Sequence, residues 1–162
     1  ELVQSMQWVK QAVLFVIGTG RDLDAMKREV VRLNLETCVR FIPKLPYQEL
    51  RAYTAIADVG VSLDKPLHLN YAYSLPNKVF DYIHAGVPLL VSDLPELRRL
   101  VETHNVGKIV RKVTPEDIAK ALNEMLQSEE RMQWRQNALK AREVLNWQNE
   151  SLVLREVYAQ LV

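Results

Sequence analysis

The chain has 162 residues, of which 48% are hydrophobic and 25% charged, and its formal net charge is +1. This balance is typical of a globular fold that buries a core, and it does not favour a nucleic-acid-binding protein, which needs a clustered basic face. The longest apolar run, Ala12–Ile17, is too short to span a bilayer, and the first residues do not resemble a secretory signal peptide. We therefore expect a cytoplasmic protein, which also suits the single cysteine, Cys38.

Apolar runs of strand length alternate along the chain with stretches of helical periodicity. The predicted strands cover residues 13–17, 38–42, 58–63, 87–92 and 107–110. The predicted helices cover residues 1–9, 22–34, 47–56, 77–85 and 95–102, and only helix is predicted from Thr114 onward. The strands are apolar throughout, as in a parallel sheet covered on both faces, and their alternation with helices indicates βαβ units. We predict one α/β domain over residues 1–162, a Rossmann-like doubly wound parallel sheet with C-terminal helices.

The C-terminal helices have clear start and pattern signals. Thr114 precedes a proline and two acidic residues, the composition of a capped first turn. The apolar residues Trp147, Leu154, Tyr158 and Leu161 predict a last amphipathic helix.

The chain opens on a predicted helix, whereas a doubly wound domain normally opens on a strand. In the usual 3-2-1-4-5-6 order, that first strand is the centre of the sheet. The strands at 13–17 and 58–63 would then lack their shared neighbour, so either residues upstream of Glu1 or another chain would supply the strand. We expect a fragment in which these two strands do not pair directly. Direct pairing would contradict this expectation.

Two glycines, Gly18 and Gly20, lie between the first visible strand and the next helix. A dinucleotide fingerprint would need a third glycine at position 23, which is Leu23 here, so an NAD-type site is not indicated. Two interpretations stay open: a turn that requires positive φ, or a turn that lets a ligand approach the backbone.

The segment 74–88 has the composition of an anion site followed by a helix. Pro76 stiffens its entrance, and Asn77 is expected to cap the helix, so that free N–H groups near Lys78 and Val79 face the crevice at the end of the preceding strand. Asp81 lies one turn further on the same side, where a carboxylate can accept hydrogen bonds from a ribose diol. The alternative is an amphipathic helix with Lys78 and Asp81 merely solvated.

The order of four segments resembles the C-terminal, donor-binding domain of GT-B glycosyltransferases, with family 4, the "group 1" retaining enzymes, as the closest likeness. The segments are Gly18-Thr-Gly20, Val39-Arg-Phe41, the stretch from Tyr53 to Val59, and Pro76-Asn-Lys-Val-Phe-Asp-Tyr-Ile-His-Ala-Gly-Val-Pro88. The resemblance covers nearly the whole chain and extends to 115–122 and to the Trp147 to Tyr158 stretch.

The resemblance implies roles for individual residues. Asp81 takes the place of the acid that holds the nucleotide ribose, while Asn77 and Lys78 contact the diphosphate, which Lys78 would stabilise as it leaves. The remaining implied donor-binding residues are Gly18, Gly20, Ile42, Pro43, Lys44, Tyr73, Ser74 and Pro76, of which Ile42 to Lys44 cradle the base. The sequence departs from the family at Tyr73, where many members have a Glu that contacts the sugar.

The implied activity is transfer of a sugar, with retention, from a nucleotide-diphosphate sugar to a glycan or lipid acceptor in polysaccharide biosynthesis. No cofactor or metal is expected, since helix N–H groups and a cation can stabilise the departing diphosphate, and His68, His84 and His104 are too widely spaced for zinc. The acceptor would bind an N-terminal lobe outside this chain, so the chain alone should not transfer sugar. The surface of the inner membrane stays open as a partner, because several cations lie close together in the sequence. They are Arg98, Arg99, Lys108, Arg111 and Lys112, and ordinary solvation of a protein surface explains their presence equally well.

Other functions stay open on the residues alone. Tyr73 in place of Glu favours a non-catalytic nucleotide-sugar-binding or regulatory module. An epimerase or phosphorylase of the same architecture would need a His–carboxylate cluster or a cofactor-linked Lys, and a receiver domain would need acidic strand ends. None of these patterns is evident.

Overall fold

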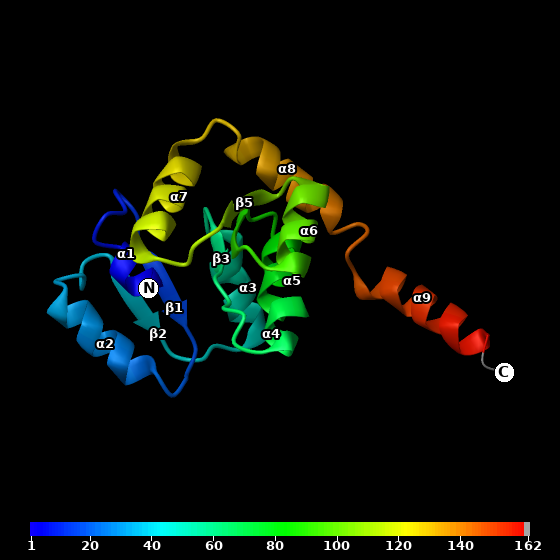
Figure 1. The fold of residues 1–162 in the computed structure, drawn as a ribbon, viewed down its shortest axis with the longest axis horizontal. Helices are drawn as coiled ribbons and strands as arrows, with labels where there is room; N and C mark the ends of the chain where they lie inside the picture. Colours follow the sequence, from blue (N-terminus) through cyan, green and yellow to red (C-terminus); the bar gives the residue numbers. More distant parts are fainter. Residues whose placement is uncertain (161–162) are drawn as a thin grey trace.

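The computed structural model describes residues 1–160 and is an α/β fold (Figure 1). Its strands are β1 (Leu14–Ile17), β2 (Val39–Ile42), β3 (Gly60–Ser62), β4 (Leu89–Ser92) and β5 (Gly107–Val110). Its helices are α1 (Leu2–Ser5), α2 (Leu23–Arg32), α3 (Tyr47–Ala55), α4 (Leu69–Tyr73), α5 (Asn77–His84), α6 (Pro95–His104), α7 (Pro115–Gln127), α8 (Arg131–Ala141) and α9 (Trp147–Ala159). The five predicted strands are confirmed, with bounds that differ by no more than two residues.

All paired strands are parallel, but they form two separate sheets. Within the described residues, β1 pairs with β2, while β3, β4 and β5 form a second sheet in that order. Figure 1 shows β1 and β2 beside α2, apart from β3. The direct pairing of β1 with β3 that would contradict the expected strand order is absent from residues 1–160.

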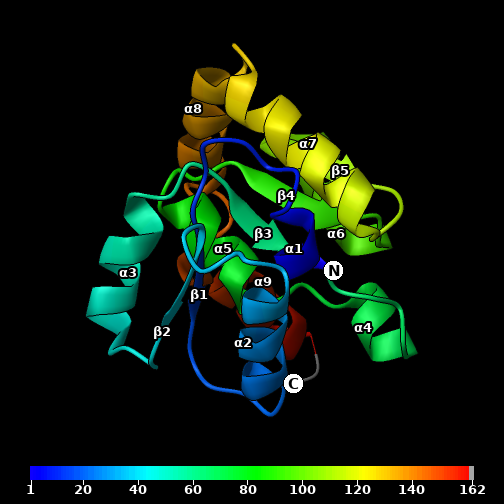
Figure 2. The same cartoon turned by 90° about the vertical axis from the view of Figure 1, so that its left-hand side faces the viewer.

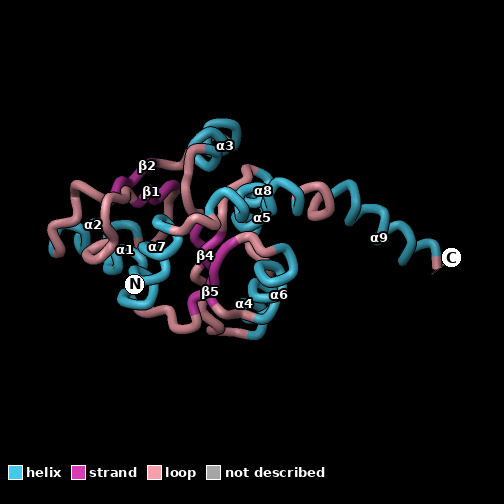
Figure 3. The backbone as a smooth tube through the Cα atoms, turned by 90° about the horizontal axis from the view of Figure 1, so that it is seen from above, coloured by secondary structure: helices cyan, strands magenta, loops and turns pink. Residues whose placement is uncertain are grey.

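The core is built around β4, whose residues are buried on both faces of the sheet. Leu89 packs with α5, α6 and α8, whereas Leu90 packs with α7 and with Trp134 of α8. Figure 3 shows β4 and β5 between α7 on one side and α5 and α6 on the other. Each such side chain contributes roughly 1.5–3 kcal/mol when fully buried. Burial on both faces explains why this strand is apolar throughout rather than alternating.

Helix α5 ends at His84, one residue before the predicted end at 85, and Gly86 lies just beyond its last turn. This glycine has φ 69°, and the Val87 amide donates to the Tyr82 carbonyl across it, which closes the last turn. A Cβ on Gly86 would lie 2.9 Å from Leu139 of α8. The glycine therefore serves both the turn and the close packing of α5 against α8.

The first helix is shorter than the predicted 1–9, because α1 ends at Ser5. The Ser5 hydroxyl donates to the Leu2 carbonyl at 2.7 Å, and from Met6 to Trp8 each amide bonds three residues back instead of four. These bonds tighten the chain into a turn that leaves the helix. Helix α4 was not predicted, since it is a single turn whose Leu69, Tyr71 and Tyr73 are exposed.

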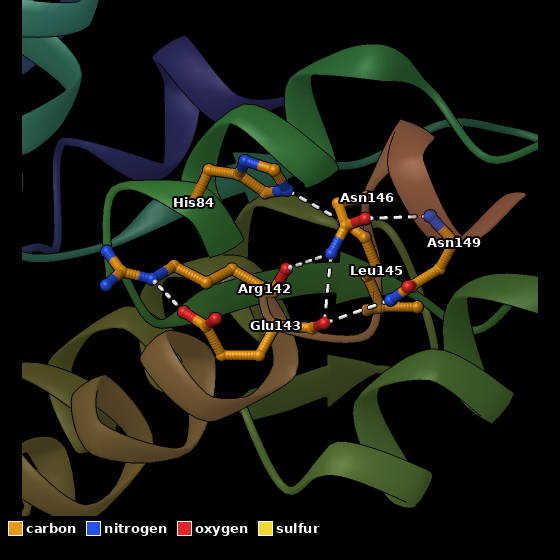
Figure 4. Close-up of polar contacts among 6 residues, drawn as sticks. All are labelled: His84, Arg142, Glu143, Leu145, Asn146 and Asn149. Carbon is orange, nitrogen blue, oxygen red and sulfur yellow. Dashed lines mark hydrogen bonds and ion pairs between the residues drawn. The ribbon is translucent and has the colours of Figure 1, made fainter. Parts of the chain in front are cut away.

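Helix α9 extends away from the rest of the fold, as Figures 1 and 3 show, and it lies behind the fold in the view of Figure 2. Its start is fixed by a network at the end of α8 (Figure 4). Asn146 caps α9 by accepting from the Asn149 amide at 3.0 Å, its own amide group donates to the Arg142 and Glu143 carbonyls, and His84 Nε2 lies 2.7 Å from the Leu145 carbonyl. Leu161, part of the predicted stripe, lies outside the described residues. No helix within residues 1–160 has the length and apolar character needed to cross a membrane.

Candidate functional site

The site is centred on the start of α5. Pro76 is the residue before the helix and Asn77 is its first residue, so Asn77 does not cap the helix as predicted and makes no side-chain cap bond. Val79 donates its amide to the Pro76 carbonyl at 3.0 Å, which also corrects the expectation of a free N–H at that position. Within residues 1–160, no hydrogen bond involves the Asn77 or Lys78 amide. These two amides and the helix dipole favour an anion at this end of α5.

Asp81 lies one turn into α5 and faces α3. The Tyr47 hydroxyl donates to Asp81 Oδ1 at 3.1 Å, and this hydrogen bond, together with the carboxylate charge, raises the pKa of Tyr47 above its ordinary value. Asp81 is part of the wall of a cavity of about 360 Å³ between α3 and α5, to which Arg51 and His84 also contribute. The sequence did not indicate Tyr47, because its partner lies 34 residues away on another helix.

Lys78 is held by a carboxylate that the sequence analysis missed. Its Nζ lies 3.6 Å from Asp64 Oδ2, and Asp64 accepts a 2.7 Å hydrogen bond from the Ser62 hydroxyl. Asp64 follows β3 closely, and the carboxyl ends of parallel strands are the usual position for ligand contacts. The Lys78 side chain is 46% exposed, so this ion pair is worth about 1 kcal/mol at most and an anionic ligand can replace the carboxylate.

The structure brings together some of the other predicted residues. The β1–β2 register pairs Ile17 with Ile42, so the loop with Gly18 and the loop with Pro43 and Lys44 leave the same edge of the sheet. Gly18 has φ 131° and donates its amide to the Ile42 carbonyl at 3.0 Å. A Cβ on Gly18 or Gly20 would meet nothing within 4 Å, so the turn needs positive φ at Gly18 and also leaves space beside the backbone.

Lys78 and Asp81 also line a larger groove of about 580 Å³ between β1 and β3. Tyr73, Ser74, Pro76 and Asn77 line neither this groove nor the smaller cavity. Tyr73 is the last residue of α4 and is 61% exposed. Within the described residues, no group of three or more His, Cys, Asp or Glu side chains could hold a metal ion.

The fold is a Rossmann-like α/β domain with a cavity and a groove beside α5, and a comparison with known families identifies the family. A family model described as glycosyl transferases group 1 matches residues 1–141. The chain therefore belongs to the group 1 glycosyltransferase family. No curated protein is detectably similar to it in sequence.

Solved structures have the same fold. A sucrose-phosphate synthase from Thermosynechococcus elongatus aligns over 99% of this chain and 41% of its own, with a TM-score of 0.82 and 20% identity. Anabaena HepE in complex with UDP and glucose aligns over 99% of this chain and 43% of its own, with a TM-score of 0.74 and 14% identity. The C-terminal domain of LpcC, a glycosyl transferase group 1 family protein from Francisella tularensis, aligns over 85% of this chain and 73% of its own. Its TM-score is 0.65 and its identity 17%. The chain spans about two fifths of the length of the first two, and it is similar to a half of a GT-B fold.

Proposed function

We propose that this chain is the donor-binding domain of a longer glycosyltransferase, which transfers a hexose from a nucleotide-diphosphate sugar with retention of configuration. The observation that carries the proposal is the pair Lys78 and Asp81, one helical turn apart at the start of α5 and both facing the groove. A cation beside two free amides suits a diphosphate, and a carboxylate one turn away suits a ribose diol.

The chemistry assigned to this domain is electrostatic. The bond between the anomeric carbon and the β-phosphate oxygen breaks, and its electron pair leaves on the diphosphate. The Asn77 and Lys78 amides and the Lys78 ammonium stabilise that charge, with Lys78 exchanging Asp64 for phosphate. The acceptor hydroxyl, held by the other lobe, forms the new bond to the anomeric carbon, and its proton passes to an oxygen of the departing diphosphate.

The first donors to test are uridine nucleotides, because the HepE structures contain UDP and UDP-glucose. We expect UDP to bind the chain weakly by calorimetry, and Asp81→Ala to lose about tenfold or more in affinity, since it removes a charge-assisted contact. Glu102→Ala is the matched control, because Glu102 is an exposed carboxylate on α6. If no nucleotide diphosphate binds, or if Asp81→Ala binds like the parent, the site assignment is wrong.

A second candidate is a nucleotide-sugar-binding module without transfer activity, favoured by Tyr73 at the position where many members have Glu. Turnover of a donor by the longer protein supports the enzyme. Tight binding without turnover supports the module.

We also propose a glycan or lipid acceptor and a cytoplasmic enzyme that works at the inner membrane. In support, one structural relative, WaaG, is a glycosyltransferase of lipopolysaccharide biosynthesis. The cations near α6 give this proposal little help, because Arg98 pairs with Asp93 and Lys108 with Glu124.

A further inference from the structure

The cavity between α3 and α5 runs along both helices from the hydrogen bond between Tyr47 and Asp81. On the α3 side it is lined by Tyr47, Arg51 and Thr54, whose spacing places them on one face of the helix. On the α5 side it is lined by Asp81 and by His84, which lies about one turn further on. The cavity therefore has the proposed ribose anchor at one end and a separate group of polar side chains beyond it.

Arg51 brings a positive charge to this cavity. Within residues 1–160, no carboxylate forms an ion pair with its guanidinium. The charge is close enough to act on the Tyr47 phenol: the hydrogen bond and charge of Asp81 raise the pKa of Tyr47, and the Arg51 charge opposes that rise. A guanidinium carries five N–H donors and no acceptor, so Arg51 suits a ligand group that only accepts.

Two neutral acceptors line the same cavity. The Thr54 hydroxyl donates to the Leu50 carbonyl at 2.9 Å, so its oxygen keeps the capacity to accept a hydrogen bond. His84 Nε2 lies 2.7 Å from the Leu145 carbonyl (Figure 4). Because a carbonyl only accepts, the hydrogen is on Nε2, and Nδ1 is the acceptor of the neutral ring. A donor cation together with neutral acceptors matches a planar group that has a carbonyl next to a ring N–H.

The depth of these groups fits a nucleobase whose ribose is held at Asp81. Arg51 follows Tyr47 by one turn, which is about 6 Å along the helix axis at 1.5 Å per residue. This length is comparable to the span from a ribose to the exocyclic atom at the far end of its base. A carbonyl there, O4 of uracil or O6 of guanine, accepts from a guanidinium, whereas the amino group of cytosine or adenine would set donor against donor.

We propose that this cavity binds the base of the donor nucleotide, and that Arg51 selects uracil or guanine, which carry a carbonyl at the far end, over cytosine or adenine. The inference rests on the proposed function, because it takes Asp81 as the ribose anchor. It differs from the base position that the family resemblance implies, since Ile42, Pro43 and Lys44 line neither the cavity nor the groove. Arg51 is then a specificity-determining residue that contacts the base and lies away from the reacting bond.

Calorimetry with nucleoside diphosphates on the 162-residue chain tests this selection. UDP and CDP differ only at position 4 and the adjacent ring nitrogen, and GDP and ADP form the purine pair. We expect UDP to bind about tenfold or more tightly than CDP, or GDP than ADP, and the tighter pair identifies the base. Arg51→Met should bring this ratio to about one, and Arg51→Glu should reverse it, because a carboxylate accepts from the amino group.

The ratio separates base selection from the general loss of a positive charge, which would weaken both members of a pair equally. Arg28→Met, at an exposed arginine of α2, is the matched control and should change neither the affinities nor the ratio. An absent or opposite preference in the parent, or a ratio that Arg51→Met leaves unchanged, would overturn this inference, while the proposed function stands if Asp81→Ala still weakens binding. A ratio that responds to Lys44→Met and not to Arg51→Met would overturn it in favour of the loop after β2. If no nucleoside diphosphate binds, both proposals fail.

Discussion

At the scale of single residues, two polar contacts hold the side chains of the candidate site, and the proposed donor would have to displace them. The Tyr47 hydroxyl donates to a carboxylate oxygen of Asp81, and the Asp64 carboxylate forms an ion pair with the Lys78 ammonium. Sequence patterns located Lys78 and Asp81, because both lie on one predicted helix, but could not pair them with partners from separate elements. The expected cap at Asn77 was wrong because Pro76 takes the N-cap position, so that Asn77 is the first residue of the helix.

Tyr47→Phe should bind UDP about threefold to tenfold more tightly than the parent. The substitution keeps the ring and removes only the hydroxyl that competes with a ribose diol for Asp81, a contact worth roughly 0.5–1.5 kcal/mol. Calorimetry measures the change, with Tyr53→Phe on the same helix as the control. Weaker binding by Tyr47→Phe would mean that the phenol contacts the nucleotide itself.

At the scale of elements, strand positions followed from the sequence because burial on both faces leaves an uninterrupted apolar run, as in β4. The limits of α1 did not follow, because Ser5 turns its hydroxyl onto the backbone and the turn after it depends on packing against other helices. The sequence also did not indicate how closely α5 approaches β3. A Cβ on Gly60 of β3 would lie 2.3 Å from the Tyr82 ring of α5.

Gly60→Ala should therefore destabilise the protein by about 1–3 kcal/mol, because the ring must move to admit a methyl group. Urea unfolding measures the difference. Gly20→Ala is the matched control, since a Cβ there meets nothing within 4 Å, and its stability should stay within about 0.5 kcal/mol of the parent. Equal effects of the two substitutions would contradict the close contact between β3 and α5.

Glu29 joins α2 to α1 and makes that contact sensitive to acid. It accepts hydrogen bonds from Gln4 and Arg32, which lower its pKa from 4.5 to about 2, with Arg32 as the larger cause. The folded pKa is below the ordinary one, so the carboxylate contributes stability above pH 4.5 and loses it as the pH falls toward 2.

Glu29→Gln should consequently reduce the difference in stability between pH 6 and pH 2.5, as measured by urea unfolding at each pH. Glu36→Gln, a nearby exposed carboxylate, should leave the difference unchanged. If both variants follow the parent curve, the Glu29 contacts do not contribute to folding in solution.

At the scale of the whole molecule, the small sheet is attached to the large one through helices rather than through strand pairing. The Asn123 side chain of α7 bonds to two backbone groups in the segment between α1 and β1. Its oxygen accepts from the Lys10 amide at 3.0 Å, and its amide group donates to the Trp8 carbonyl at 2.8 Å. The lack of direct pairing between β1 and β3 was predictable from the strand order, whereas this connection between residues more than 100 positions apart was not.

Asn123→Ala should accelerate amide exchange in β1 and β2 by about threefold or more, while amides in β4 keep their protection. The reason is that two hydrogen bonds, each worth roughly 0.5–1.5 kcal/mol, fix the small sheet to α7. Lys120→Ala, on an exposed part of α7, is the control. Equal acceleration in all strands would show that the two sheets open as one unit.

The network that fixes the start of α9 has a consequence for how the chain moves through solution. Hydrogen bonds from Asn146 and Asn149 to the end of α8 set the direction in which this helix leaves the fold. A helix of 13 residues is roughly 20 Å long, so it forms an arm beside an otherwise rounded body. Such a particle has more frictional drag than a sphere of the same mass, and its sedimentation coefficient is correspondingly lower.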